Sequence, residues 1–385
     1  MRRRVGDLFQ SVTEYFTSLD KGILLVAILL SAFGLAAVHT ATAAGSNHDH
    51  DMMIQTIGIC VGLLVVLVFS KIDYTLLGRF SVPIVIICAG VLLITAFIGN
   101  YSGGNTNWLD LGFVSVQPSE FAKVAFILTF STHVAGSMDS LNRIPTVSFL
   151  VLHFLAYFIP ICIQGDFGTA LVYTGVFLVI LYLAGVQYRY FLVAGVTFVA
   201  AFPVFWNFVL KDYHKKRILF SLNPELDPLD FGYQPILSKI AIGSGGLTGL
   251  GYGEGVQSQN ELLPESHTDF IYSVIGEEFG FIGCIFVLLL ISLLVLLLAR
   301  GARHAKDDAG KLICSGLAAM FAVQTMMNVG MCIGVSPVIG VTLPFISAGG
   351  SSVLASFFAI GLAESVRMKP DLSLRFGDRR RRRRM

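Results

Sequence analysis

The residues of this chain best suited to phosphate chemistry lie in one segment between two long apolar stretches. Lys215, Lys216 and Arg217 follow one another, and Lys239 comes later in the same segment. Lysine supplies a point charge and arginine a bidentate fork, so this set could bind a phosphate group. Composition alone favours a simpler alternative, a solvated loop at residues 211–269 whose cations offset its eight acidic residues.

A carboxylate with the potential for acid–base chemistry follows at Asp269. It could act as a general base for a sugar hydroxyl. Ser266 and Asp269 also fit the Ser-x-x-Asp form of a capping box, which spacing alone favours. The apolar segment 279–298 is long enough to cross the hydrocarbon core of a lipid bilayer. Asp269 would then lie ten residues, or ~15 Å of helix, above that core. A helix N-terminus would lower the pKa of this carboxylate and burial would raise it, and the sequence leaves that balance open.

Other polar residues lie at or near the expected helix ends. Asp166 precedes a predicted helix, and its favoured role is the N-cap. Glu120 and Lys123 are three residues apart inside a predicted span, where they are either functional or a buried structural pair. Ser351 belongs to residues 343–352, which break one helix and begin another. Such backbone at membrane depth must be buried in protein or line a wet cavity.

Several other patterns are assigned ordinary structural roles. The seven glycines of residues 243–255 are not followed by Gly-Lys-Ser/Thr, so they do not form a nucleotide P-loop. Residues 48–51, His-Asp-His-Asp, lack a partner cluster for a metal and are expected to be solvated. The lone histidines on apolar helices are expected to be core residues. All six cysteines fall within predicted spans, without a disulfide or zinc pattern.

Composition indicates the elements that must position these residues. Of the 385 residues, 55% are apolar and only 14% are charged, whereas a soluble domain has roughly 25% charged residues. This excludes a soluble enzyme, a disordered chain and the usual kind of nucleic-acid binder. Because a helix needs ~20 apolar residues to cross a bilayer, we predict an all-α polytopic membrane protein. Its ten transmembrane helices are expected at 22–44, 52–69, 81–99, 118–135, 146–163, 167–186, 190–210, 279–298, 312–334 and 349–366.

The distribution of lysine and arginine predicts the orientation. With the N-terminus in the cytoplasm, 21 of the 27 basic residues lie inside, and the four short outside loops contain none. We therefore expect a cytoplasmic (inner) membrane protein with both termini in the cytoplasm and its active site outside. The predicted parts are a basic N-terminus (1–21), seven helices (22–210), a large extracytoplasmic loop and catalytic segment (211–278), three helices (279–366) and an arginine-rich tail (367–385).

Many short motifs, in order along nearly the whole chain, resemble the SEDS family (shape, elongation, division and sporulation) and most closely its RodA branch. The matching segments include residues 107–112, 117–123, 166–170, 212–217, 223–228, 232–234, 239–246, 257–258, 263–270, 277–278 and 344–352. The chain departs from the family pattern at several positions. Leu250 stands where a lysine is common, which removes a cation from the glycine-rich loop, and we assign that loop no phosphate role.

The resemblance implies a peptidoglycan glycosyltransferase that polymerises lipid II outside the membrane, together with a class B penicillin-binding protein as transpeptidase partner. Asp269 matches the family's essential aspartate, and this match, not its spacing, favours the general base over the cap. We expect inverting transfer, assisted by a divalent cation, Mg²⁺ or Mn²⁺. Other membrane proteins of the elongation machinery are further expected partners. The candidate substrate-binding residues are Lys215, Lys216, Arg217, Lys239, Glu120, Lys123, Asp166, His267, Thr268 and Ser351.

Three alternatives stay open at this point. The chain could be an FtsW- or SpoVE-like septal or spore polymerase instead of an enzyme of cell elongation and shape maintenance. It could be a lipid II flippase, although transporters usually bind substrate near the midplane and the polar candidates here gather towards the outer face. It could also be a catalytically silent scaffold that activates its transpeptidase partner.

Overall fold

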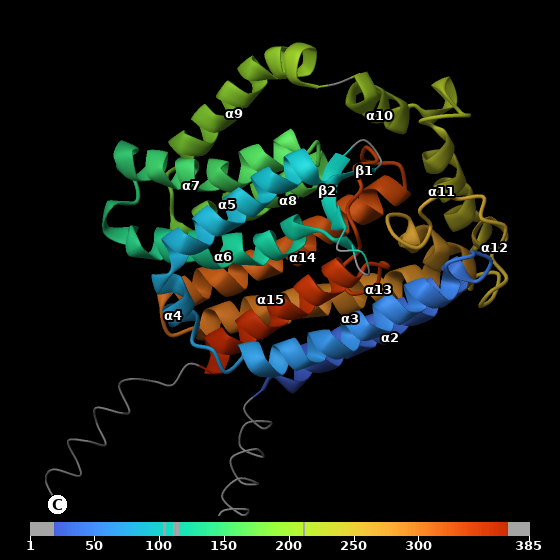
Figure 1. The fold of residues 1–385 in the computed structure, drawn as a ribbon, viewed down its shortest axis with the longest axis horizontal. Coiled ribbons are helices and arrows are strands. Elements are labelled where there is room, and N and C mark those ends of the chain that lie inside the picture. Colours follow the sequence, from blue (N-terminus) through green and yellow to red (C-terminus); the bar gives the residue numbers. More distant parts are fainter. Residues whose placement is uncertain (1–18, 103–104, 111, 113–114, 211, 369–385) are drawn as a thin grey trace, which may run out of the picture.

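Ten helices of 17 residues or more run through the described part of the chain and form a bundle (Figure 1). The structure, a computed structural model, describes residues 19–102, 105–110, 112, 115–210 and 212–368. Most of the basic N-terminus, Lys211 and the arginine tail lie outside the described residues. The long helices are α2 (Lys21–Thr42), α3 (His48–Phe69), α5 (Ser81–Ile98), α6 (Pro118–Gly136), α7 (Ile144–Ile163), α8 (Phe167–Ala184), α9 (Tyr188–Val204), α13 (Ile271–His304), α14 (Asp308–Cys332) and α15 (Gly350–Met368).

The predicted all-α membrane fold is confirmed. Nine helices within the described residues are long and apolar enough to cross a membrane. The tenth long helix, α6, is less apolar and carries Glu120 and Lys123 in its first half. It is nevertheless well inside the bundle, because it packs against α5, α14 and α15. Because Glu120 and Lys123 are buried in protein, α6 can cross the membrane although it carries two charged residues.

Aspartates begin several of these helices. Asp20, Asp73, Asp166 and Asp307 each precede a helix and accept a hydrogen bond from a backbone N–H of its first turn. These side chains satisfy N–H groups that have no partner within the helix. The predicted N-cap role of Asp166 is thus observed at the start of α8, where its Oδ1 accepts from the Thr169 N–H at 3.0 Å.

The helices differ greatly in how much protein surrounds them. α14 packs against α6, α8 and α13, and α15 packs against α3, so these helices form the centre of the bundle. None of the residues of α9 is buried. In Figure 1, α9 rises away from the bundle and continues through the π-helical turn η2 (Phe205–Val209). A helix so apolar and so exposed fits contact with lipid.

The predicted large loop between the seventh and eighth spans is partly helical. One end of the bundle also has a small antiparallel sheet in the order β1-β2-β3. The short elements are α4 (Tyr74–Arg79), η1 (Met138–Ser140), α10 (Asp212–Leu222), η3 (Pro224–Leu226), α11 (Tyr233–Ser244), α12 (Val256–Gln259), β1 (Asn100–Ser102), β2 (Asn105–Asp110) and β3 (Ser115–Val116). The sheet, α10 and the chain around α11 surround the same polar region.

Helix α13 begins at Ile271, eight residues before the predicted span, and it has a break at Gly280, whose φ is 64°. The glycine-rich loop fills this break. The N–H groups of Leu250 and Gly251 donate to the carbonyls of Glu277 and Glu278 at 2.9 and 3.2 Å. The loop carbonyls of residues 246 and 247 accept from the N–H groups of residues 281 and 282 at 2.9 and 3.2 Å. The glycines therefore allow close backbone packing on α13.

Candidate active site

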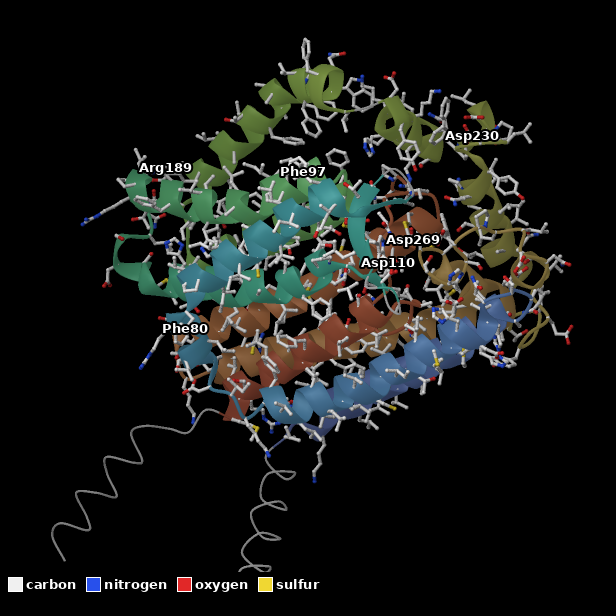
Figure 2. All side chains as sticks on the ribbon, in the orientation of Figure 1. Phe80, Phe97, Asp110, Arg189, Asp230 and Asp269 are labelled. Carbon is white, nitrogen blue, oxygen red and sulfur yellow. The ribbon has the colours of Figure 1, made fainter. Side chains whose placement is uncertain are left out.

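A polar cavity of about 800 Å³ opens at the end of the bundle that carries the sheet and α10. Its wall is built from several distant parts of the chain: the start of α3, strand β2, helix α10, residues 229–234, residues 264–269 and residues 338–352. Asp110, Asp230 and Asp269 contribute carboxylates from three of these parts (Figure 2). The cavity wall thus combines segments more than 200 residues apart in sequence.

Helix N-termini meet at this cavity. The wall includes His50 and Asp51 from the first turn of α3, the N-cap residue Gln117 of α6, Asp269 just before α13, and Gly350 at the start of α15. The free N–H groups of a helix start carry partial positive charge. Four helix starts around one cavity therefore favour an anionic ligand, although the acidic side chains of the wall oppose it.

Asp269 lies in the wall of this cavity, two residues before α13. A Cβ added at Gly340 would lie 3.3 Å from Asp269 Oδ2, so the carboxylate lies close to Gly340 in the segment 338–342. Its oxygens have no hydrogen bond or ion pair with any described residue. Burial raises the pKa of Asp269 to about 6; Glu265 and Asp166 add to the increase, and Arg217 opposes it. This is the environment of a carboxylate that can accept a proton near neutral pH.

The competing capping-box interpretation of Ser266 and Asp269 is wrong. Helix α13 has Phe270 as its N-cap residue, with no side-chain cap hydrogen bond. Burial, and not the helix N-terminus, dominates the pKa of Asp269. The balance that the sequence left open is thereby decided in favour of a raised pKa.

His267 and Thr268 line the cavity together with Asp269. The Thr268 hydroxyl donates to Glu265 Oε2 at 2.7 Å, and Glu265 has a left-handed backbone with φ 55°. A non-glycine residue in this region is uncommon and often lies near a functional site. Three consecutive residues of the predicted segment 263–270, residues 267 to 269, thus line one cavity.

Of the predicted phosphate-binding cations, only Arg217 lines the cavity. Its guanidinium lies 5.9 Å from the ring centre of Tyr213, which also lines the wall. Lys215 pairs with Asp212 at 3.6 Å, and Lys216 is exposed on the same helix. Lys239 is exposed on α11 and lies against Gly334. These three lysines are outside the cavity wall.

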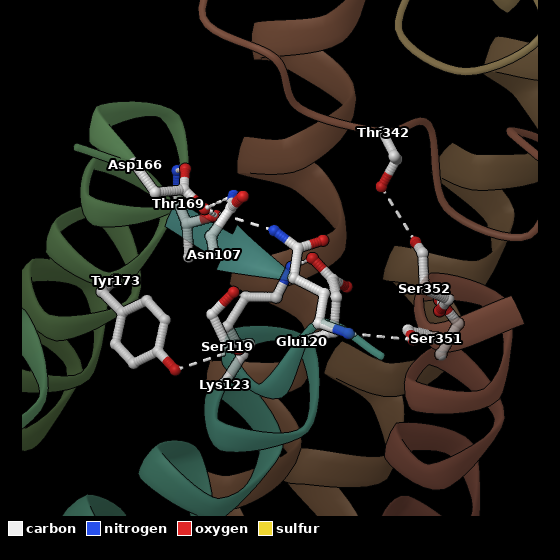
Figure 3. A network of polar contacts seen from close by, with 12 residues as sticks. Asn107, Ser119, Glu120, Lys123, Asp166, Thr169, Tyr173, Thr342, Ser351 and Ser352 are labelled. Atoms are coloured by element: carbon white, nitrogen blue, oxygen red, sulfur yellow. Dashed lines mark hydrogen bonds and ion pairs between the residues drawn. The ribbon is translucent and has the colours of Figure 1, made fainter. Parts of the chain in front are cut away.

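Asp166 belongs to a polar network next to the cavity (Figure 3). Its Oδ2 accepts hydrogen bonds from Asn107 Nδ2 at 2.8 Å, Gln117 Nε2 at 3.2 Å and the Thr169 hydroxyl at 2.9 Å. The Gln117 N–H donates to the Ser351 hydroxyl at 3.2 Å. Asp166 is only 1% exposed and does not line the wall, but Asn107 and Gln117 do. Asp166 and Ser351 therefore position wall residues.

Glu120 and Lys123 form the predicted pair within α6. Lys123 Nζ lies 2.7 Å from Glu120 Oε1, and both side chains are buried. Neither residue lines the cavity. Their arrangement matches the structural alternative, a buried and mutually neutralised pair in a membrane helix.

Comparison with known proteins decides the family. Residues 20–371 match the FtsW, RodA and SpoVE family, described as "Cell cycle protein". The chain belongs to this family. It is 37% identical over 352 residues to the peptidoglycan glycosyltransferase MrdB of Escherichia coli, covering 90% of this chain and 93% of MrdB. It is also 37% identical over 367 residues to a probable peptidoglycan glycosyltransferase FtsW of Geobacter metallireducens, covering 91% and 95%.

A solved structure agrees with this family assignment. A chain in the structure described as "Structural coordination of polymerization and crosslinking by a peptidoglycan synthase complex" is 27% identical and superimposes with a TM-score of 0.78. The match covers 91% of this chain and 97% of that one. The chain therefore has the fold of the FtsW/RodA/SpoVE family. It is a multi-pass protein of the inner membrane.

The cavity wall of this family member also contains residues to which the motifs assign no role. Trp108, Asn107 and Gln117 occur in the matched motifs without a role, and they line the cavity. Asn328 was in no motif, yet its side chain contacts the backbone of Asp269. A buried asparagine in an apolar helix is itself a signal, since polar side chains in membrane helices usually have a specific partner.

Proposed function

We propose that this chain polymerises lipid II into β-1,4 glycan strands with Asp269 as the general base. The enzyme is a peptidoglycan glycosyltransferase, the class to which its named relatives belong. The observation that carries the assignment of Asp269 is its environment: a carboxylate in the wall of a large cavity, without a hydrogen-bond partner among the described residues and with a pKa raised to about 6.

In the proposed reaction, the acceptor sugar hydroxyl attacks the anomeric carbon of the donor sugar. The new C–O bond forms as the bond to the lipid-linked pyrophosphate breaks, and the configuration at that carbon inverts. Asp269 takes the proton of the attacking hydroxyl, and the electron pair of the broken bond leaves with the pyrophosphate. Arg217 lines the same cavity and is our candidate to stabilise the leaving group. Lys215, Lys216 and Lys239 would contact only parts of the substrate outside the cavity.

A divalent cation fits this cavity only if it arrives with the substrate. No group of three or more His, Cys, Asp or Glu residues in the described ranges could hold a metal ion. Mg²⁺, however, is commonly held by one or two carboxylates and by substrate phosphates. Glu265 is the first candidate ligand, because it lines the cavity and acts electrostatically on Asp269. When bound, Mg²⁺ or Mn²⁺ would neutralise charge on the pyrophosphate.

We further propose that the cavity faces the extracytoplasmic side, that both termini are cytoplasmic, and that a class B penicillin-binding protein is the partner. The lysine and arginine distribution supports the orientation. The synthase complex that contains a similar chain supports the partner. A role in elongation rests on the RodA-like residues 212–233, because identity to MrdB and to FtsW is equal at 37%. Sidewall rather than septal enrichment of a tagged copy is the expected result.

The assignment is tested with lipid II supplied in detergent to the purified chain and its transpeptidase partner. Asp269→Asn should reduce glycan formation by at least about 100-fold, the lower end of the range for general-base catalysis. Glu254→Gln, which changes an exposed acid outside the cavity wall, is the matched control. Polymerisation by the wild type would exclude a pure flippase or scaffold, since no flipping is required. A folded Asp269→Asn variant with the wild-type rate would show that the base is another residue.

A further inference from the structure

The backbone around Asp269 is held by hydrogen bonds from other parts of the chain. Three consecutive carbonyls, of residues 267, 268 and 269, each accept a hydrogen bond from a different donor. The Ala348 N–H donates to His267 O at 2.8 Å, the Ser347 hydroxyl to Thr268 O at 2.7 Å, and Asn328 Nδ2 to Asp269 O at 2.8 Å. We call these three hydrogen bonds the carbonyl clamp.

The two side chains of the carbonyl clamp are themselves fixed. Asn328 is fully buried on α14, and its Nδ2 also donates to Val341 O at 2.7 Å. Ser347 is 1% exposed, and its hydroxyl accepts from the Leu343 N–H at 2.7 Å. An amide nitrogen has two donor hydrogens and a hydroxyl has one, so the donors of both side chains are fully used. The clamp therefore joins the catalytic segment rigidly to α14 and to the loop before α15.

The carbonyl clamp acts on residues of the cavity wall. The carbonyls of residues 267–269 are hydrogen-bonded to α14 and to the loop before α15, and the same three residues line the cavity. Because the Asp269 carboxylate has no hydrogen-bond partner among the described residues, nothing bonded to its oxygens orients it, and its position depends on the backbone. A displacement of ~1 Å of a reacting group can reduce a rate by about 100-fold.

We propose that Asn328 and Ser347 are positioning residues for glycosyl transfer, which hold residues 267–269 so that the Asp269 carboxylate faces the acceptor hydroxyl. The inference rests on the proposed function of Asp269. Neither residue lines the cavity, so neither is expected to bind lipid II. Removing either hydrogen bond should therefore affect kcat and leave KM nearly unchanged.

The experiment compares variants of the full chain, purified in detergent with its transpeptidase partner, over a range of lipid II concentrations and pH. Asn328→Ala and Ser347→Ala should lower kcat by at least about tenfold and change KM by less than about twofold. Ser347→Thr keeps the hydroxyl and should recover most of kcat. The controls are Thr325→Val and Ser356→Ala, which remove buried hydroxyls bonded within their own helices. They should stay within about twofold of the wild type.

The pH profile separates positioning from a general loss of folded protein. In Asn328→Ala and Ser347→Ala, the rise of kcat with pH should occur at a different pH than in the wild type, because the Asp269 carboxylate then lies in a different environment. A smaller folded fraction scales kcat at every pH equally, and that result, or values equal to the controls, would overturn the inference. If Asn328→Ala does not fold, the pair Ser347→Ala and Ser347→Thr decides, because both leave the Asn328 hydrogen bonds in place.

Failure of this inference can be told from failure of the proposed function. An active Asp269→Asn variant would refute the proposed base whatever the clamp variants do. An inactive Asp269→Asn variant, with clamp variants that behave like the controls, would refute the carbonyl clamp alone.

Discussion

At the scale of single residues, the chemistry depends on how Asp269 is solvated. An exposed aspartate has a pKa near 3.9 and is a weak base at neutral pH. Burial raises the pKa of Asp269 to about 6, although Arg217 opposes the increase. A general base is most effective when its pKa approaches the working pH, because a large fraction of it is then ionised and its proton affinity is still high.

The first prediction concerns the pH dependence of polymerisation. Only the ionised carboxylate accepts a proton, so kcat should rise with pH through an apparent pKa near 6. Arg217→Ala removes an influence that lowers the pKa of Asp269 and should move this limb to higher pH. The measurement is kcat for glycan formation between pH 5 and 8. Lys216→Ala, an exposed cation on the same helix, should leave the limb in place. A limb near pH 4, or one unchanged in Arg217→Ala, would contradict the assignment.

The second prediction concerns the stability cost of the same carboxylate. Its folded-state pKa of about 6 exceeds the ordinary value of 3.8, so the folded state favours the protonated form. The contribution of this carboxylate to stability is therefore most favourable below pH 4, falls between about pH 4 and 6, and stays constant above that range. Asp269→Asn lacks this loss and should be more stable than the wild type by about 2–3 kcal/mol at pH 8, since one pKa unit corresponds to about 1.4 kcal/mol. The difference should vanish at pH 4. Thermal unfolding in detergent at both pH values checks this, and equal Tm values at pH 8 would contradict it.

At the scale of elements, the start of α13 is shaped by the glycine-rich loop packed against it. A Cβ added at Gly249 would lie 2.0 Å from Glu278 O, and one at Gly245 would lie 1.9 Å from Gly276 O. Gly249 also has φ +84°, where a side chain is strained. This close contact lets loop backbone satisfy the hydrogen bonds that the break at Gly280 leaves open.

The third prediction follows from these contacts. Gly245→Ala and Gly249→Ala should each destabilise the protein by about 1–3 kcal/mol, because loop and helix must separate to admit the methyl group. Gly243→Ala is the matched control, since its added Cβ would meet nothing within 4 Å and the residue lies in α11. Thermal unfolding of the three variants in detergent is the measurement. Wild-type Tm values for Gly245→Ala and Gly249→Ala would show that the contact with α13 is not needed for stability.

At the scale of the whole molecule, the two ends of the bundle can be told apart by what they carry. One end carries the cavity, with Leu229 90% exposed on its wall. The other end carries the turn between α13 and α14, with the exposed Arg303. A bilayer around the apolar helices would place these two ends in different compartments.

The fourth prediction is a test of that orientation. In a background without the six native cysteines, Leu229→Cys should react with a membrane-impermeant maleimide added outside intact spheroplasts. Arg303→Cys should react only after the membrane is opened. Each variant serves as the control for the other, and both should react in detergent. Labelling of Arg303→Cys alone from outside would reverse the proposed topology and place the cavity in the cytoplasm.

The amino-acid sequence by itself determined the number and position of the long helices, since hydropathy and charge are local properties that accumulate along the chain. It also indicated the helix-capping role of Asp166 and, through ordered motifs, the family and Asp269. Only the tertiary structure decided which candidates share a cavity: Arg217, His267, Thr268 and Asp269 do, whereas Lys215, Lys216, Lys239, Glu120 and Lys123 do not. It likewise joined Asn328 and Ser347 to residues 59 and 79 positions away. Such contacts, and the burial that raises the pKa of Asp269, arise from packing between distant segments, which no local pattern of residues specifies.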